Sequence, residues 1–295
     1  MQYVAILGAG PAALIAAQAC SLAGQPFAIF TKYEGGEPVK SKLGGAQFVH
    51  RPLPGMHDED KPDGVLRYKV VGSADGYRQK VYGNEPVPFV SMERVREGLE
   101  VPCWSLQKTY DTLWNGIVYT GSRTSANEAN VDARLVQELL NDGAFKAVIS
   151  TVPKHAICKT ASHEPGTPYE PPHTFRAQRI HLINRSVLLQ DPAQNVIVYD
   201  GTPYTSWYRT SLIFGHGSTE WGEGAAVPPY LKDDQVITAT KPLFTNCTCW
   251  RDEPRVLMTG RYGDWRKGAL VHDAFTETWE LLQDMNGRVD VGPVQ

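Results

Sequence analysis

A short apolar segment, a glycine-rich turn and an apolar helix follow one another at the start of this 295-residue chain. Residues 3–7 (Tyr-Val-Ala-Ile-Leu) are predicted to form a buried strand, Ala12–Ala23 a helix, and Pro26–Phe30 a second buried strand. Two buried strands joined by one helix indicate a parallel sheet with helices packed on its faces. This unit therefore restricts the chain to an α/β fold more strongly than any other feature of the sequence.

The turn between the first strand and the helix, Gly8–Ala13 (Gly-Ala-Gly-Pro-Ala-Ala), fits the dinucleotide-binding pattern G-x-G-x-x-G/A. Gly8 permits a tight turn, Gly10 lets the backbone approach a pyrophosphate, and Ala13 is small enough for close helix–strand packing. The first N–H groups of the helix carry a partial positive charge that favours phosphate. Because the pattern follows a strand and opens a helix, the sequence predicts a dinucleotide site here.

The end of the second strand departs from this pattern. An Asp or Glu is expected there to bind the ribose hydroxyl groups, whereas this chain has Thr31 followed by Lys32. Thr31 can hydrogen-bond a hydroxyl group, and Lys32 can pair with a phosphate. An NADP-binding reductase therefore stays open as one alternative.

Elements of the same kind return near the middle and the end of the chain. Residues 145–152 and 255–259 are predicted as buried strands, and Leu270–Met285 as a final helix. Other helices are expected over residues 106–118 and 132–140. The intervening segments have antiparallel character, with strands expected over residues 67–71, 79–82, 179–183, 195–199 and 206–214.

This order of elements predicts two domains. The first is a Rossmann-like domain with a central parallel sheet, assembled from residues 1–54, 131–165 and 252–295. The second is a smaller α+β substrate or cap domain with an antiparallel sheet, assembled from residues 55–130 and 166–251.

The composition is that of a globular protein, with 42% hydrophobic residues, 21% charged residues and a formal net charge of −3. This balance argues against a general nucleic-acid or polybasic membrane binder. No apolar run reaches the ~18 residues of a membrane span, and the N-terminus lacks the pattern of a signal peptide. We expect a cytoplasmic protein, without a membrane partner, that takes a small-molecule or nucleotide-like substrate. A mild excess of basic residues between positions 67 and 96 leaves nucleic acid open as a partner, and the oligomeric state is open as well.

The five cysteines are Cys20, Cys103, Cys158, Cys247 and Cys249. An odd number without a secretory signal favours reduced thiols. Cys247 and Cys249 are the only close pair, and no second Cys/His pair stands at the spacing of zinc ligands. The sequence therefore predicts no metal site.

A resemblance to a known family rests on the Gly8–Ala13 turn and on three further segments. These are residues 45–50 (Gly-Ala-Gln-Phe-Val-His), 207–211 (Trp-Tyr-Arg-Thr-Ser) and 260–265 (Gly-Arg-Tyr-Gly-Asp-Trp). With them the chain resembles the flavin-dependent superfamily that has a glutathione-reductase-like FAD domain. Within it, the nearest resemblance is to UDP-galactopyranose mutase and flavin amine oxidase-like proteins. Residues 45–50 are similar to the mutase motif G-[PA]-H-x-F-H beside the flavin, although Gln47 stands in place of the first histidine. Residues 260–265 look like the C-terminal G-R-x-G motif that holds FAD.

The resemblance implies FAD as the cofactor. The glycine turn and Arg261 would neutralise the pyrophosphate, the small residues near Gly45 would pass close to the flavin ring, and N–H groups at the start of the last helix would lie near flavin N1 and O2. The residues expected to bind the cofactor are Gly8, Gly10, Pro11, Ala12, Ala13, Thr31, Lys32, Gly45, Ala46, Gln47, Val152, Gly260, Arg261, Trp265, Gly268, Ala269 and Leu270.

His50 and Arg209 are the candidate catalytic residues. His50 matches the second histidine of the mutase motif and could position the substrate or accept a proton near neutral pH. Arg209 matches an arginine that faces substrate phosphates in the mutases, and its guanidinium suits a phosphate or a carboxylate. The alternatives are a hydrogen-bonded histidine of the loop and an arginine held in an internal ion pair.

We therefore expect an FAD-dependent oxidoreductase, of the amine oxidase type, that acts on a C–N or C–O centre by hydride transfer to flavin N5. Two alternatives remain open. One is a redox-neutral, mutase-like flavoenzyme in which reduced FAD acts as the nucleophile. The other is a binding protein without catalysis, similar to Rab GDP-dissociation inhibitors.

Overall fold

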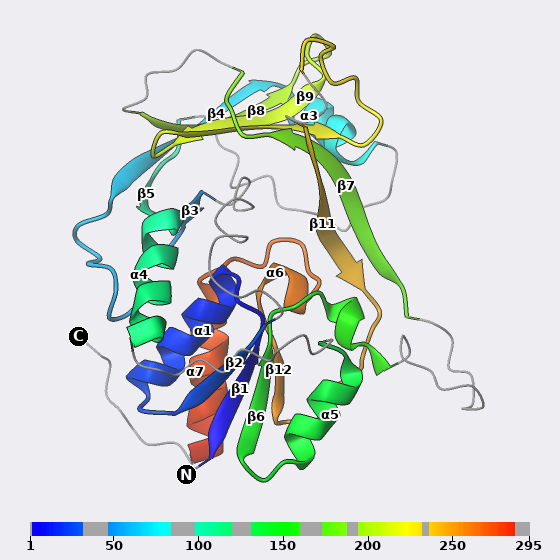
Figure 1. Cartoon of the computed structure of the whole chain (residues 1–295). Helices are drawn as coiled ribbons and strands as arrows, with labels where there is room; N and C mark the ends of the chain where they lie inside the picture. Colours follow the sequence, from blue (N-terminus) through cyan, green and yellow to red (C-terminus); the bar gives the residue numbers. More distant parts are fainter. Residues whose placement is uncertain are drawn as a thin grey trace. The chain divides into compact units, whose positions relative to one another are not determined.

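The computed structural model describes residues 2–31, 47–83, 98–119, 131–159, 173–187, 194–231 and 236–286. The chain divides into two compact units, most of whose elements are labelled in Figure 1. Unit 1 comprises Met1–Lys40, Lys108–Arg176 and Pro242–Gln295. Unit 2 comprises Ser41–Gln107 and Ala177–Lys241.

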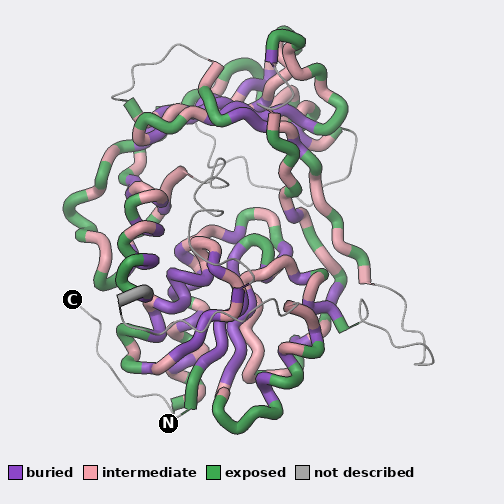
Figure 2. The backbone as a smooth tube through the Cα atoms, in the orientation of Figure 1, coloured by how far each residue is buried: buried purple, intermediate pink, exposed green. Residues whose placement is uncertain are grey.

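Unit 1 contains a four-stranded sheet in the order β12-β6-β1-β2, in which all neighbouring strands run parallel. The strands are β1 (Tyr3–Leu7), β2 (Phe27–Phe30), β6 (Phe145–Ser150) and β12 (Val256–Met258). Figure 2 shows β1 and β6 buried over most of their length, as expected for apolar strands covered on both faces. The predicted parallel sheet is therefore confirmed.

Helices surround this sheet. They are α1 (Pro11–Leu22), α4 (Leu106–Tyr119), α5 (Ala133–Asn141) and α7 (Asp273–Asn286), with the short helices η2 (Lys154–Ile157) and α6 (Gly260–Gly263). Val136, Leu139 and Leu140 of α5 share one core with Ala5 and Leu7 of β1. Since alternate residues of a strand point to opposite faces, Val4 and Ile6 face the other side, where α1 packs on the strands and against α7. None of the helices in the described part of the chain combines the length and the apolar composition that a bilayer-spanning segment needs.

Unit 2 contains most of an eight-stranded sheet in the order β11-β7-β10-β9-β8-β4-β5-β3. Its strands are β3 (Phe48–Val49), β4 (Gly64–Gly72), β5 (Glu100–Ser105), β7 (Phe175–Ile183), β8 (Asn195–Gly201), β9 (Trp207–Ile213), β10 (His216–Gly222) and β11 (Ile237–Thr245). The β7–β10–β9–β8 run is antiparallel, and β4 pairs with β8 in parallel. The α/β class with a second, largely antiparallel sheet is confirmed.

One predicted strand is a helix. Residues 79–82 belong to α3 (Ala74–Tyr82), which packs on β8, β9 and β10. The side chain of Ser73 caps this helix by accepting the Gly76 N–H at 2.9 Å. Val81 is the only buried side chain of α3, so the sequence of this helix has only a weak apolar periodicity. The N-cap residue Ser73 is the stronger sequence indication of a helix.

The units divide the chain at different positions from the expected domain boundaries. Residues 108–119 belong to unit 1, where the Tyr110 hydroxyl donates to the backbone oxygen of Ala9 at 2.9 Å. Residues 41–54 belong to unit 2, where Gln47 hydrogen-bonds to Ser211 and His216. Residues 173–176 and 242–251 also belong to unit 1 rather than to the expected cap domain. The contacts of Tyr110 and Gln47 join residues more than 100 positions apart, which no local pattern reveals.

Candidate functional site

The glycine turn lies at the carboxyl end of β1 and is fixed by its neighbours in unit 1. Gly8 has φ +111°, a region that favours glycine, and its N–H donates to the Phe30 oxygen at 2.8 Å. A Cβ at Gly8 would lie 2.5 Å from Thr151 Oγ1 and 3.5 Å from Val152 Cγ1. Gly8 is therefore required by the protein itself, with or without a ligand.

Gly10 has a different environment. It is the N-cap residue of α1 in extended conformation, and Pro11 occupies the first turn. In the described part of the chain, no side chain caps this helix, and a Cβ at Gly10 would have no atom within 4 Å. The protein fold thus does not require glycine at this position, while the helix start presents backbone N–H groups that favour an anion.

The C-terminal motif packs against this turn. Gly260 has φ +74°, and a Cβ there would lie 2.7 Å from the Cβ of Ala12. The Thr259 N–H donates to the Ser150 oxygen at 3.0 Å, and Gly263 approaches the same oxygen closely. Segments around Ala12, Ser150 and Gly260 therefore converge at the carboxyl ends of β1, β6 and β12, the edge at which open α/β sheets bind ligands.

Tyr110 is a supporting residue that the sequence did not single out. Its hydroxyl holds the Ala9 oxygen inside the turn, and its ring stacks on Trp114 with centroids 6.2 Å apart. Burial raises the pKa of this hydroxyl to about 12, so it stays a neutral donor. The sequence predicts the helix over residues 106–118, but the hydrogen-bond partner of Tyr110 lies 101 positions away and has no local signal.

The other expected cofactor residues of unit 1 differ in their surroundings. Thr31 is buried at the end of β2, and Arg261 is exposed on α6. Trp265 is 4% exposed, donates its indole N–H to the Arg176 oxygen at 3.0 Å, and packs edge-on against His155 and Phe175. Trp265 therefore serves the core of unit 1. Lys32, Gly45 and Ala46 lie outside the described residues.

The expectation for residues 268–270 needs a correction. The last helix begins at Asp273 rather than Leu270, and the Leu270 N–H already donates to Asp273 Oδ2 at 2.7 Å. Gly268 has φ +86° and lies in a turn before the helix, and Ala269 is buried. The Leu270 N–H is therefore used within the protein, because the Asp273 carboxylate caps the turn that the sequence assigned to the helix.

In unit 2, the side chain of Gln47 is held by the second sheet. Its Nε2 donates to the His216 oxygen and its Oε1 accepts from Ser211 Oγ, both at 2.7 Å. The ring of His50 packs on that of Phe48 with centroids 4.3 Å apart. Gln47 thus ties the segment that carries His50 to β9 and β10.

Arg209 forms the internal ion pair that the sequence left open as the alternative to substrate binding. Its Nη2 lies 2.6 Å from Glu220 Oε1, and the Tyr208 hydroxyl donates to Glu220 Oε2 at 2.8 Å. Lys241 forms a second ion pair with the same carboxylate. Burial alone would raise the pKa of Glu220, but Arg209 and Lys241 lower it to about 2. We call these four residues the Glu220 cluster.

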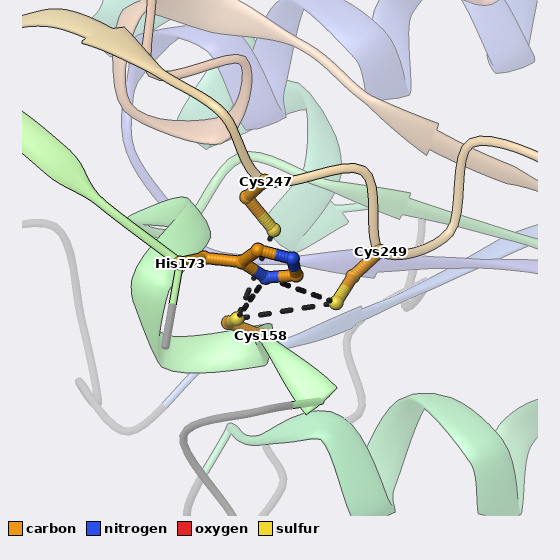
Figure 3. A group of neighbouring side chains, drawn as sticks. All are labelled: Cys158, His173, Cys247 and Cys249. Atoms are coloured by element: carbon orange, nitrogen blue, oxygen red, sulfur yellow. Dashed lines mark hydrogen bonds between the residues drawn. The ribbon is translucent and has the colours of Figure 1, made fainter. Parts of the chain in front are cut away.

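A second group of side chains bears on the expectation of no metal site, because it could hold a metal ion. Cys158, His173, Cys247 and Cys249 of unit 1 place one sulfur or nitrogen atom each within 4.8 Å of all the others (Figure 3). Cys158 follows η2, His173 precedes β7, and the two other cysteines lie between β11 and β12. The partners of Cys249 lie 76 and 91 positions away, so the Cys-Thr-Cys pair was the only local signal.

The comparisons with known proteins concern the fold. No family model and no curated protein matches the chain. Among solved structures, the myxobacterial chondrochloren halogenase CndH, an FAD-dependent halogenase, is 10% identical with a TM-score of 0.50, covering 98% of this chain and 77% of that one. The flavin-dependent brominase Bmp2 is 12% identical with a TM-score of 0.50, covering 99% and 82%. The chain therefore has a fold similar to that of the flavin-dependent halogenases.

Proposed function

We propose that unit 1 binds FAD and that the protein is an FAD-dependent oxidoreductase. The observation that carries the proposal is the start of α1, where no described side chain caps the helix and no described atom lies within 4 Å of a Cβ at Gly10. The fold shared with flavin-dependent enzymes supports the same cofactor. The segments around Val152 and Gly260 meet at this edge, as the FAD motif requires.

The residues present suit the parts of FAD. The backbone of Gly10 and the Ala12 N–H at the start of α1 would bind the pyrophosphate, because Pro11 has no N–H and the Ala13 N–H donates to the Gly10 oxygen at 3.0 Å. The exposed Arg261 would add a positive charge. Thr31, at the end of β2, would bind a hydroxyl group of the adenosine in place of the usual acid. Tyr110 would keep the turn in the binding conformation through Ala9.

Bound FAD would supply a two-electron acceptor, and we propose a C–N or C–O centre of a small or nucleotide-like substrate as the hydride donor. His50 is the proposed proton acceptor, because an imidazole titrates near neutral pH. Arg209 is better explained by its ion pair with Glu220 than by a substrate phosphate. His50 is therefore the residue to test first for catalysis.

The cofactor is tested by the absorption spectrum of the purified protein and by the binding of FAD to the apoprotein. The variant Gly10→Ala should lose at least about tenfold in FAD affinity, or about 1.4 kcal/mol, because its methyl group occupies the space for the pyrophosphate. Its thermal unfolding should match the wild type, since a Cβ there meets no described atom. Gly143→Ala, which is equally open and far along the chain, is the matched control.

A colourless protein that fails to take up FAD at saturating concentration would refute the proposal and favour a binding protein without catalysis. For a flavoprotein, anaerobic titration with a panel of amines and alcohols tests the reaction. Bleaching by one substrate, with hydrogen peroxide formed on admission of air, supports the oxidase chemistry. Turnover that requires reduced flavin but causes no net oxidation of the flavin or the substrate would instead support the mutase-like alternative.

A further inference from the structure

The cluster of Cys158, His173, Cys247 and Cys249 lies outside the proposed flavin chemistry. We propose that these four residues bind one structural Zn²⁺ ion in unit 1. Three thiolates and one imidazole form one of the usual ligand sets of structural zinc. Because the four protein atoms would fill all four tetrahedral positions, none is left for water or substrate, which distinguishes this site from a catalytic one.

The distances between the ligand atoms support tetrahedral coordination. Zinc bonds of usual length imply about 3.8 Å between two sulfur atoms and about 3.6 Å between sulfur and nitrogen. Cys158 Sγ lies 3.7 Å from Cys247 Sγ and 3.9 Å from Cys249 Sγ. His173 Nδ1 lies 3.6 Å from Cys249 Sγ and 3.2 Å from Cys158 Sγ. Figure 3 shows the three sulfur atoms arranged around the imidazole.

Hydrogen bonds around the cluster hold the ligand-bearing segments together. Next to His173, the Thr174 N–H donates to Asn246 Oδ1, and the Thr245 hydroxyl donates back to the Thr174 oxygen, both at 2.7 Å. The indole of Trp250 donates to the Ile157 oxygen at 2.8 Å, joining the residues that adjoin Cys249 and Cys158. Such outer contacts fix ligand orientation in metal sites.

The position of the cluster indicates what the ion would do. His173 lies two residues before β7, and Cys247 two residues after β11. These are the strands in which the chain passes from one unit to the other, at Arg176–Ala177 and Lys241–Pro242. The ion would join His173 before β7 and the two cysteines after β11 to Cys158, which follows η2. It would thereby close the chain between Cys158 and His173 and the chain between His173 and Cys247, which stabilises unit 1.

The first experiment measures the metal content of the reduced, full-length protein by mass spectrometry of the elements. We expect about one zinc per chain, whether or not FAD is bound, so this result is separate from that of the proposed function. Cys247→Ser and Cys249→Ser should lose the zinc. Cys20→Ala, which removes a buried thiol of α1 outside the cluster, should keep it.

Wild-type protein provides a second measurement that does not depend on the folding of variants. A strong chelator should lower the unfolding temperature, and stoichiometric Zn²⁺ should restore it. Replacing zinc by Co²⁺ in protein stripped of flavin should give the visible absorption of tetrahedral thiolate coordination. Reduced apoprotein that binds no Zn²⁺, iron in place of zinc, or a disulfide between two of the three cysteines would each overturn the proposal.

Discussion

The glycine turn of unit 1 and the Glu220 cluster of unit 2 differ in what forms them: the turn is formed by the backbone, and the cluster by charged and polar side chains. The turn consists of backbone and open space: Gly8 adopts a positive φ, and nothing in the described structure occupies the volume beside Gly10. The cluster is centred on a buried charge: the Glu220 side chain is 1% exposed, and it pairs with Arg209 and Lys241, whose side chains are 21% and 25% exposed. We therefore expect substitutions in the cluster to lower the stability of the protein. In the turn, a substitution of Gly8 should lower stability, whereas a substitution of Gly10 should lower only the affinity for the ligand.

The largest expected effect is that of Glu220→Gln. Removing this carboxylate takes away the charge that compensates Arg209 and Lys241, and breaking a buried pair in this way costs about 3–5 kcal/mol. Denaturant unfolding measures the loss. Glu223→Gln is the control, because its exposed carboxylate lies 3.9 Å from Arg179 and should contribute less than about 0.5 kcal/mol. Equal losses in both variants would contradict the proposed importance of the cluster.

The same carboxylate predicts the response to acid. The pKa of Glu220 is about 2 in the folded protein and 4.5 in the unfolded chain, so its contribution is complete above pH 4.5. It is lost as the pH falls towards 2, by about 3 kcal/mol in total. Unfolding measured between pH 5 and 2 should therefore show a shallower loss in Glu220→Gln than in the wild type. Parallel curves would mean that other groups determine acid unfolding.

Gly8→Ala should have the next largest effect and contrasts with Gly10→Ala. The φ of +111° and the approach of Thr151 Oγ1 to 2.5 Å both oppose a side chain at Gly8, at a cost of about 1–3 kcal/mol. Gly10→Ala should unfold like the wild type, because a Cβ there meets no described atom within 4 Å. Unfolding and FAD titration of both variants measure the difference. A similar loss of stability in both variants would contradict the proposal, because it would mean that the space beside Gly10 is not open in the folded protein.

The same contrast explains what could be predicted from the sequence. The turn and the strands of unit 1 follow from short patterns whose physical meaning is local, whereas the approach of Gly260 to Ala12 is implied by the family resemblance. The Leu270 N–H, the ion pair of Arg209 and the cluster around Cys158 depend on partners that only the fold brings near. Residue type showed what Arg209 can bind, but the choice between a substrate phosphate and an internal ion pair required the tertiary structure.

The smallest expected loss of stability is that of Tyr110→Phe. This residue combines features of both regions, because its side chain supports a turn of the backbone. The change leaves the stacking on Trp114 and removes the buried hydrogen bond to the Ala9 oxygen, at a cost of about 1 kcal/mol. Hydrogen exchange at residues 8–13 should accelerate, and FAD affinity should fall severalfold. Tyr3→Phe, at an exposed ring, is the control. If exchange at the turn is unchanged while stability falls, Tyr110 supports only the packing of α4, and the turn holds its conformation through Gly8 and its backbone partners alone.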